Sequence, residues 1–127
     1  MTEKDGVTYV NDCYNANPTS MVAALETFAA MPCAGRRVAV LGDMFELGDR
    51  KEEFHSRVLA RAAELPLDAV FAVGAAMCDA AAAVAGRPPC QVADAAAAKE
   101  ALATFVRAGD AVLLKASHGM HLEAVLA

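Results

Sequence analysis

Short continuous apolar runs recur along the chain and predict β-strands. Runs of this kind, bounded by Gly, Pro, Asn or Asp, are typical of parallel strands that are covered on both faces. The clearest is Val-Ala-Val-Leu, which ends at Gly42. The predicted strands are residues 7–12, 37–41, 69–73, 90–92 and 111–115.

Helices are predicted between these runs, because the apolar residues there recur at helical spacing. We expect the first over residues 18–30, with Asn17 as the N-cap and Pro18 as the first helical residue. Asp49 is expected to begin the next helix, with Glu52 as its capping-box partner. The remaining predicted helices are residues 75–85, residues 94–107 and a short one that closes the chain near Ala127.

The alternation of strands and helices predicts the fold class. Helices of this length between strands imply right-handed crossovers and a mostly parallel sheet with helices on both faces. We therefore expect an α/β protein, a Rossmann-like three-layer domain with a sheet of about five strands. The 127 residues suit one domain, residues 1–127, and no linker, repeat or charge block divides them.

Composition limits the classes of protein that the chain can represent. Hydrophobic residues make up 57% of the sequence, yet no apolar run is long enough to cross a membrane and the amino end is polar. A net charge of −5 gives no basic face for nucleic acid. The four cysteines are scattered, without a CxxC pair, and are expected to be reduced and mostly buried. We therefore expect a cytoplasmic protein that binds neither nucleic acid nor membrane.

Polar residues follow three of the predicted strands, and ligands of an open parallel sheet bind beyond the carboxyl ends of its strands. Asp12, Asn15 and Asn17 follow the first strand beside a predicted helix start, which suits ribose hydroxyls or a phosphate. The same spacing fits equally well a helix that Asn17 caps and a strand that Asp12 ends. Spacing alone leaves both interpretations open.

Charged residues follow two further strands. Asp43 and Glu46 lie in a glycine-bounded loop, where paired carboxylates can bind a hydroxyl, an amine or a water on magnesium. Spacing alone favours a solvated turn for this pair. Lys115 ends a predicted buried strand, where an ammonium is costly unless it is paired. A contact with an anionic substrate is at least as well supported there as a simple exit to the surface.

Signals for several other classes are absent from the sequence or incomplete. It contains no GxxxxGK[ST] phosphate loop, no GxGxxG after the first strand and no nucleophile elbow. A phospho-receiver domain needs an aspartate after the third strand, where Val-Gly stands instead. His118 and His121, with Glu123 nearby, have no third ligand at motif spacing, so we expect no metal site. His55 is expected to be an exposed helical residue.

Taken together, three loops resemble the carboxy-terminal domain of the Mur ligases. The strings are Asp-Cys-Tyr-Asn-Ala-Asn-Pro at 12–18, Leu-Gly-Asp-Met-Phe-Glu-Leu-Gly at 41–48 and Gly-Asp-Ala-Val-Leu-Leu-Lys-Ala-Ser at 109–117. They occur in matching order over nearly the whole chain, and the first two are similar to those of the branch that adds D-alanyl-D-alanine. The resemblance implies ATP-dependent amide-bond formation through an acyl phosphate, which the amine of D-alanyl-D-alanine attacks.

The resemblance also implies roles for individual residues, none of them catalytic. The residues that match the segment facing the nucleotide are Asp12, Tyr14, Asn15 and Asn17. Those that match a second motif, lining the same cleft, are Asp43 and Glu46. Those that match a Lys-Gly-Ser-Arg-like segment near the incoming dipeptide are Lys115, Ser117 and His118. Ala116 and His118 replace the usual glycine and arginine of that segment, which makes His118 a weaker cation for a carboxylate.

Enzymes of the family have three domains, and the resemblance places this chain in the third, a lid that closes over ATP. It implies ATP and Mg2+ as cofactors and UDP-N-acetylmuramoyl-tripeptide as the second substrate of the full-length enzyme. The UDP-sugar domain and the central P-loop domain are then the missing partners. The chain alone is expected to be inactive and to bind ATP weakly. The alternative is a stand-alone Rossmann-like binding module without ligase activity.

Overall fold

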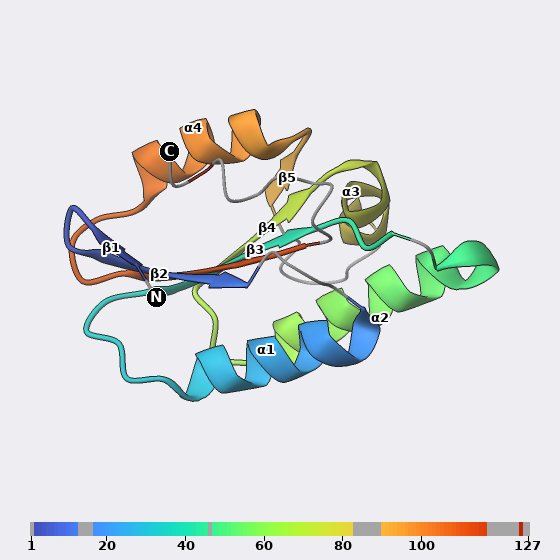
Figure 1. The fold of residues 1–127 in the computed structure, drawn as a ribbon, viewed down its shortest axis with the longest axis horizontal. Helices are drawn as coiled ribbons and strands as arrows, with labels where there is room; N and C mark the ends of the chain where they lie inside the picture. Colours follow the sequence, from blue (N-terminus) through green and yellow to red (C-terminus); the bar gives the residue numbers. More distant parts are fainter. Residues whose placement is uncertain (1, 13–16, 46, 83–89, 117–124, 126–127) are drawn as a thin grey trace.

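The structure, a computed structural model, describes residues 2–12, 17–45, 47–82, 90–116 and 125, in which strands and helices alternate (Figure 1). The strands are β1 (Thr2–Lys4), β2 (Val7–Asp12), β3 (Arg37–Gly42), β4 (Ala69–Val73), β5 (Cys90–Val92) and β6 (Ala111–Lys115). The helices are α1 (Pro18–Ala30), α2 (Lys51–Glu64), α3 (Ala75–Ala82) and α4 (Ala95–Phe105), with a 3-10 turn, η1 (Gly48–Arg50), before α2. Each predicted strand is confirmed, and β3 is one residue longer than expected.

Within the described part of the chain, six strands form one sheet in the order β1-β2-β6-β3-β4-β5. β1 runs antiparallel to β2, and the other neighbouring pairs are parallel. From β2 to β5 the chain moves across the sheet in one direction, and it then returns to place β6 between β2 and β3. The parallel strands therefore end at one edge of the sheet, called the carboxyl edge below.

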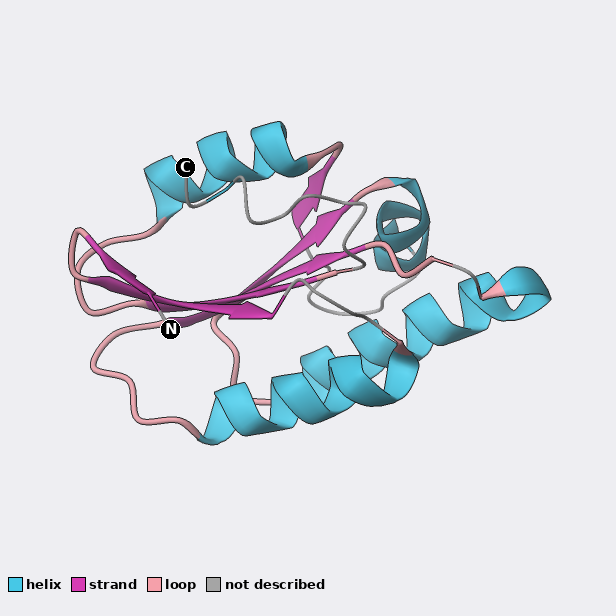
Figure 2. Ribbon diagram, viewed as in Figure 1, coloured by secondary structure: helices cyan, strands magenta, loops and turns pink. Residues whose placement is uncertain are grey.

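Helices cover both faces of this sheet, which confirms the three-layer prediction (Figure 2). Right-handed crossovers in one direction place α1, α2 and α3 on one face, and the return from β5 places α4 on the other. The core under the first three helices includes Met21, Leu25, Leu59, Met77 and Leu113. The core under α4 includes Ala98, Leu102, Val40, Val112 and Leu114.

The central position of β6 explains its apolar sequence. All five of its residues are buried, and successive side chains point to opposite faces of the sheet. Leu113 packs in the core of α1–α3, whereas Val112 and Leu114 pack in the core of α4. Both faces of this strand therefore exclude water, which is the reason for a continuous apolar run rather than an alternating one.

β1 is not among the predicted strands, because its three residues are exposed and carry no apolar pattern. It joins β2 through a two-residue turn in which Asp5 and Gly6 have φ angles of 54° and 80°. Glycine adopts positive φ freely and aspartate tolerates it, so Asp-Gly is a preferred pair for a type I′ hairpin turn. That dipeptide is the signal from which the hairpin could have been predicted.

The start of α2 also differs from the prediction. Asp49 lies inside η1, and α2 begins at Lys51 with Arg50 at the N-cap and no side-chain cap. The capping box of Asp49 with Glu52 is therefore wrong. A capping side chain requires an extended backbone at its own residue, and the 3-10 turn removes Asp49 from that conformation. The chain-closing helix lies outside the described residues except for residue 125.

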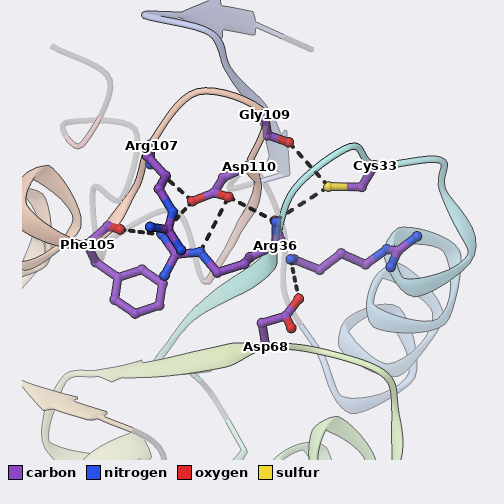
Figure 3. A network of polar contacts seen from close by, with 8 residues as sticks. Cys33, Arg36, Asp68, Phe105, Arg107, Gly109 and Asp110 are labelled. Carbon is purple, nitrogen blue, oxygen red and sulfur yellow. Dashed lines mark hydrogen bonds and ion pairs between the residues drawn. The ribbon is translucent and has the colours of Figure 1, made fainter.

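An ion-pair network lies at the opposite edge of the sheet, where the parallel strands begin (Figure 3). Asp110, which is 2% exposed, accepts hydrogen bonds from the Arg36 guanidinium at 2.8 Å and from the backbone N–H groups of Arg36 and Arg107 at 2.9 and 3.0 Å. The Arg36 guanidinium lies 4.2 Å from the centre of the Phe105 ring. Burial raises the pKa of Asp110, but these hydrogen bonds and the Arg36 charge outweigh it and lower the pKa below its usual value. The network joins the start of β3 to the turn before β6.

The described helices are short and each buries one stripe. α2, with 14 residues, buries His55, Val58, Leu59 and Ala62. None of the described helices has the length and apolarity needed to cross a membrane.

Candidate functional site

The carboxyl edge brings together the strand ends that carry the predicted site residues. Asp12, at the end of β2, is paired in register with Lys115 at the end of β6. Lys115 is paired on its other side with Leu41 of β3, and Asp43 follows two residues later. The three segments singled out in the sequence therefore leave the sheet from neighbouring strands.

Lys115 is buried at this edge. Its side chain is 2% exposed, so the interpretation of a simple exit to the surface is wrong. Because side chains alternate along a strand, Lys115 lies on the same face as Leu113, toward the layer of α1–α3. Burial of an ammonium is costly in free energy unless interactions at its site compensate for it.

Asn17 caps α1 and so confirms one of the two interpretations of its spacing. Its Oδ1 accepts a hydrogen bond from the Ser20 N–H at 2.8 Å, and the Ser20 hydroxyl accepts one from the Asn17 N–H at 3.0 Å. With Pro18 at the first helical position, this capping box fixes the helix start close to the end of β2. The cap uses one acceptor site of the side-chain oxygen, and the side-chain amide nitrogen is the donor that Asn17 could offer to a ligand.

The Asp43 carboxylate contacts the start of α3. Its two oxygens accept hydrogen bonds from the N–H groups of Met77 at 2.7 Å and Ala76 at 3.2 Å, where the helix dipole favours an anion. Gly74 makes room for this contact: its φ is 99°, and a Cβ there would lie 2.7 Å from the carboxyl atoms of Asp43. Asp43 therefore connects the loop after β3 to the loop after β4.

His55 is completely buried, so the expectation of an exposed residue is wrong. Its Nε2 accepts a hydrogen bond from the Met44 N–H at 2.9 Å, and its Nδ1 lies 2.7 Å from the carbonyl oxygen of Lys51. His55 precedes Val58 and Leu59 by three and four residues, so all three fall on the buried face of α2. That spacing is the signal from which its burial could have been predicted.

Cys78, in α3, is a partly buried thiol close to the same edge. Its Sγ donates to the carbonyl oxygens of Val92 at 3.3 Å and Ala72 at 3.4 Å. Burial raises the pKa of the Cys78 thiol, and the charge of Asp43 adds to that rise against the opposing hydrogen bonds. A thiol in this environment is a poor nucleophile at neutral pH.

Several predicted site residues lie outside the described part of the chain. They are Tyr14, Asn15, Glu46, Ser117 and His118, and for Asp12 the structure describes only the backbone. The ligand-binding roles given to all these residues remain predictions. Within the described ranges, no group of three or more His, Cys, Asp or Glu side chains is placed to hold a metal ion.

Comparison with known proteins identifies relatives over nearly all of the chain. The family described as "Mur ligase, glutamate ligase domain" matches residues 1–118. The UDP-N-acetylmuramoyl-tripeptide--D-alanyl-D-alanine ligase of Mycobacterium leprae is 39% identical over 143 residues, covering 98% of this chain and 28% of that protein. The ligase of the same name from Treponema pallidum is 40% identical over 121 residues, covering 92% of this chain and 26% of that protein.

Among solved structures, the MurF ligase of Thermotoga maritima in complex with ADP is similar to this chain. The two superpose with a TM-score of 0.79 at 33% identity, over 98% of this chain and 28% of that chain. The chain therefore spans somewhat more than a quarter of the length of the relatives that it matches.

Proposed function

The chain belongs to the Mur ligase family, and from that premise we propose that it is the carboxy-terminal domain of an ATP-dependent ligase that adds D-alanyl-D-alanine to UDP-N-acetylmuramoyl-tripeptide in peptidoglycan precursor synthesis. One observation carries the proposal: 98% of the chain matches a ligase of that name at 39% identity. The stand-alone binding module is not favoured, because the relatives that the chain matches are named as ligases.

In this proposal residues 1–127 form one domain of a larger protein. The single sheet with a core on each face supports one folding unit. A UDP-sugar domain and a central P-loop domain would supply what the sequence of this chain lacks, since it has no GxxxxGK[ST] loop to hold the β- and γ-phosphates. The domain would act in the cytoplasm as a lid over ATP.

The nucleotide is assigned to the carboxyl edge near the end of β2. The residues proposed to face it are Asp12, Tyr14, Asn15 and Asn17. The adjacency of the β2 end, the start of α1 and Lys115 supports this assignment, because nucleotides bind at the carboxyl ends of parallel strands. The ADP held by the Thermotoga maritima ligase supports ATP as the nucleotide.

The incoming dipeptide is assigned to the end of β6. Lys115, Ser117 and His118 are proposed to lie near it, with Lys115 offering its ammonium to an anionic group. Asp43 and Glu46 are proposed to line the same cleft from the loop after β3, on the other side of β6 from the end of β2. The Asp43 carboxylate is already bonded to α3, so Asp43 would shape the cleft rather than bind through that carboxylate.

The chemistry assigned to this domain is positioning and the exclusion of water. Phosphoryl transfer depends mainly on positioning and on neutralising charge, and closure of a lid over ATP contributes to both. Mg2+ belongs to the proposed full-length enzyme, where it would neutralise phosphate charge. Because the described residues offer no group of three or more metal-ligating side chains, no step is assigned to a metal that this chain holds.

Replacing Lys115 tests the proposal in the full-length ligase. Lys115→Met keeps the length and burial of the side chain but removes its charge, and we expect kcat/KM for D-alanyl-D-alanine to fall by about 100-fold or more. Lys99→Met, on the exposed surface of α4, is the matched control and is expected to leave the rate unchanged. Equal rates for the two variants would contradict the assignment, as would robust ATP hydrolysis by the isolated chain.

A further inference from the structure

His55 makes two hydrogen bonds that define the protonation of its ring. A backbone N–H can only donate, so the Nε2 atom that accepts from Met44 at 2.9 Å carries no proton. The Nδ1 atom, 2.7 Å from the Lys51 carbonyl oxygen, must then carry the proton and donate it. The ring is therefore neutral, in the Nδ1–H tautomer, and each nitrogen has a defined partner.

The partner of this ring lies in the loop after β3, at the carboxyl edge. Met44 is itself buried, at 2% exposed, so without His55 its N–H would be left unpaired away from water. The preceding residue, Asp43, is held independently by the N–H groups of Ala76 and Met77. Two consecutive residues of the loop are therefore held by two helices: Asp43 by the start of α3 and Met44 by His55 of α2.

The next residue, Phe45, is exposed to solvent. Its side chain is 46% exposed, whereas that of Met44 is packed in the core of α1–α3. A one-residue shift of the backbone would exchange the directions of these two side chains. The hydrogen bond from Met44 to His55 opposes that shift, because it fixes the orientation of the Met44 amide.

We propose that His55 is a positioning residue for the cleft: through the Met44 amide it fixes the loop after β3 in the conformation that binds nucleotide. The nucleotide in this inference rests on the proposed function, whereas the contacts between His55 and the loop do not depend on it. A leucine at this position would fill the core without the cost of burying two ring nitrogens. The paired imidazole is therefore better explained by its hold on the loop than by packing alone.

Nuclear magnetic resonance of the 127-residue chain tests the geometry. The 15N shifts and couplings of the His55 ring are expected to show the Nδ1–H tautomer. In His55→Leu the Met44 amide is expected to exchange with solvent about tenfold faster or more, relative to an equally destabilised Leu59→Ala control from the same buried face. His55→Gln, whose side-chain oxygen can accept from Met44, is expected to retain most of the protection.

Two results would overturn the geometry. One is an Nε2–H tautomer in the wild-type ring, which needs no variant and so stands even if His55→Leu does not fold. The other is exchange at Met44 that is the same in His55→Leu and Leu59→Ala, because a purely structural role predicts equal effects.

Kinetics of the full-length ligase test the consequence for binding. We expect His55→Leu to raise the KM for ATP by about tenfold with kcat within about threefold of wild type, while His55→Gln and Leu59→Ala stay close to wild type. An unchanged KM in an active enzyme overturns the positioning role. If wild-type enzyme made no amide product although the ring and exchange results held, the proposed function would fail and the loop anchor would stand.

Discussion

Replacing Gly74 with alanine tests the contact that joins the loops after β3 and β4. Gly74 has a φ of 99°, and a Cβ there would lie 2.7 Å from three atoms of the Asp43 carboxyl group. Holding an L-residue at such an angle costs about 1–3 kcal/mol. Displacing Asp43 from the N–H groups of α3 costs about 1 kcal/mol more, as for a lost N-cap. Gly74→Ala is therefore expected to lower the free energy of unfolding by about 2–4 kcal/mol.

Urea unfolding followed by far-ultraviolet circular dichroism measures this loss, since the sequence contains no Trp for fluorescence. Gly48→Ala is the matched control: φ is 61° there and a Cβ would meet nothing within 4 Å, so only a backbone cost of about 1–2 kcal/mol is expected. Asp43→Ala removes the clash, so the double variant with Gly74→Ala should cost about 1 kcal/mol less than the two single losses added together. A loss no larger than that of Gly48→Ala, or strict additivity with Asp43→Ala, would refute the reasoning.

Three further predictions follow from single contacts. Asn17→Ala should lower the free energy of unfolding by about 1 kcal/mol and Asn17→Asp by much less, as measured by urea unfolding, because aspartate retains the cap. Asp110→Asn should lower the free energy of unfolding by about 3 kcal/mol at neutral pH, since it breaks a buried ion pair. Because the native pKa of Asp110 lies below 3.8, the wild type loses this stabilisation as pH falls below that value, and the difference in unfolding free energy between the two proteins should shrink. Iodoacetamide at neutral pH should modify Cys78 much more slowly in native than in urea-unfolded protein, as measured by mass spectrometry, because burial raises its pKa.

The sheet and its layers could be predicted from the sequence because their signals are local. Continuous apolar runs such as 111–115 identify strands buried on both faces, and the cap at Asn17 with Pro18 sets the start of α1. Alternation with helices then leaves few possible topologies. The polar ends of three strands indicated the edge at which those strands meet.

The details that the sequence did not reveal depend on contacts between distant segments. The role of the Asp43 carboxylate depends on α3 coming within hydrogen-bond distance, and nothing at 43–48 alone indicates that. Its spacing from Val58 and Leu59 places His55 on the buried face of α2, but its hydrogen bond with the Met44 amide depends on where the loop after β3 packs. β1 is a different case: it is exposed and has no apolar pattern, and the Asp5-Gly6 turn is the local signal that indicates the hairpin. The contacts of Asp43 and His55 cannot be predicted from local propensity, because tertiary packing decides them.

The most direct test of the central claim is a domain exchange. The chain would replace the matching segment of the Mycobacterium leprae ligase, and mass spectrometry would follow ATP-dependent joining of D-alanyl-D-alanine to UDP-N-acetylmuramoyl-tripeptide. The same ligase without that segment, and the isolated chain, serve as controls that are expected to form no product. We predict that the exchanged enzyme forms the amide product. A folded exchange enzyme that binds ATP but forms none, beside an active parent, would contradict the claim that this chain is the ligase's carboxy-terminal domain.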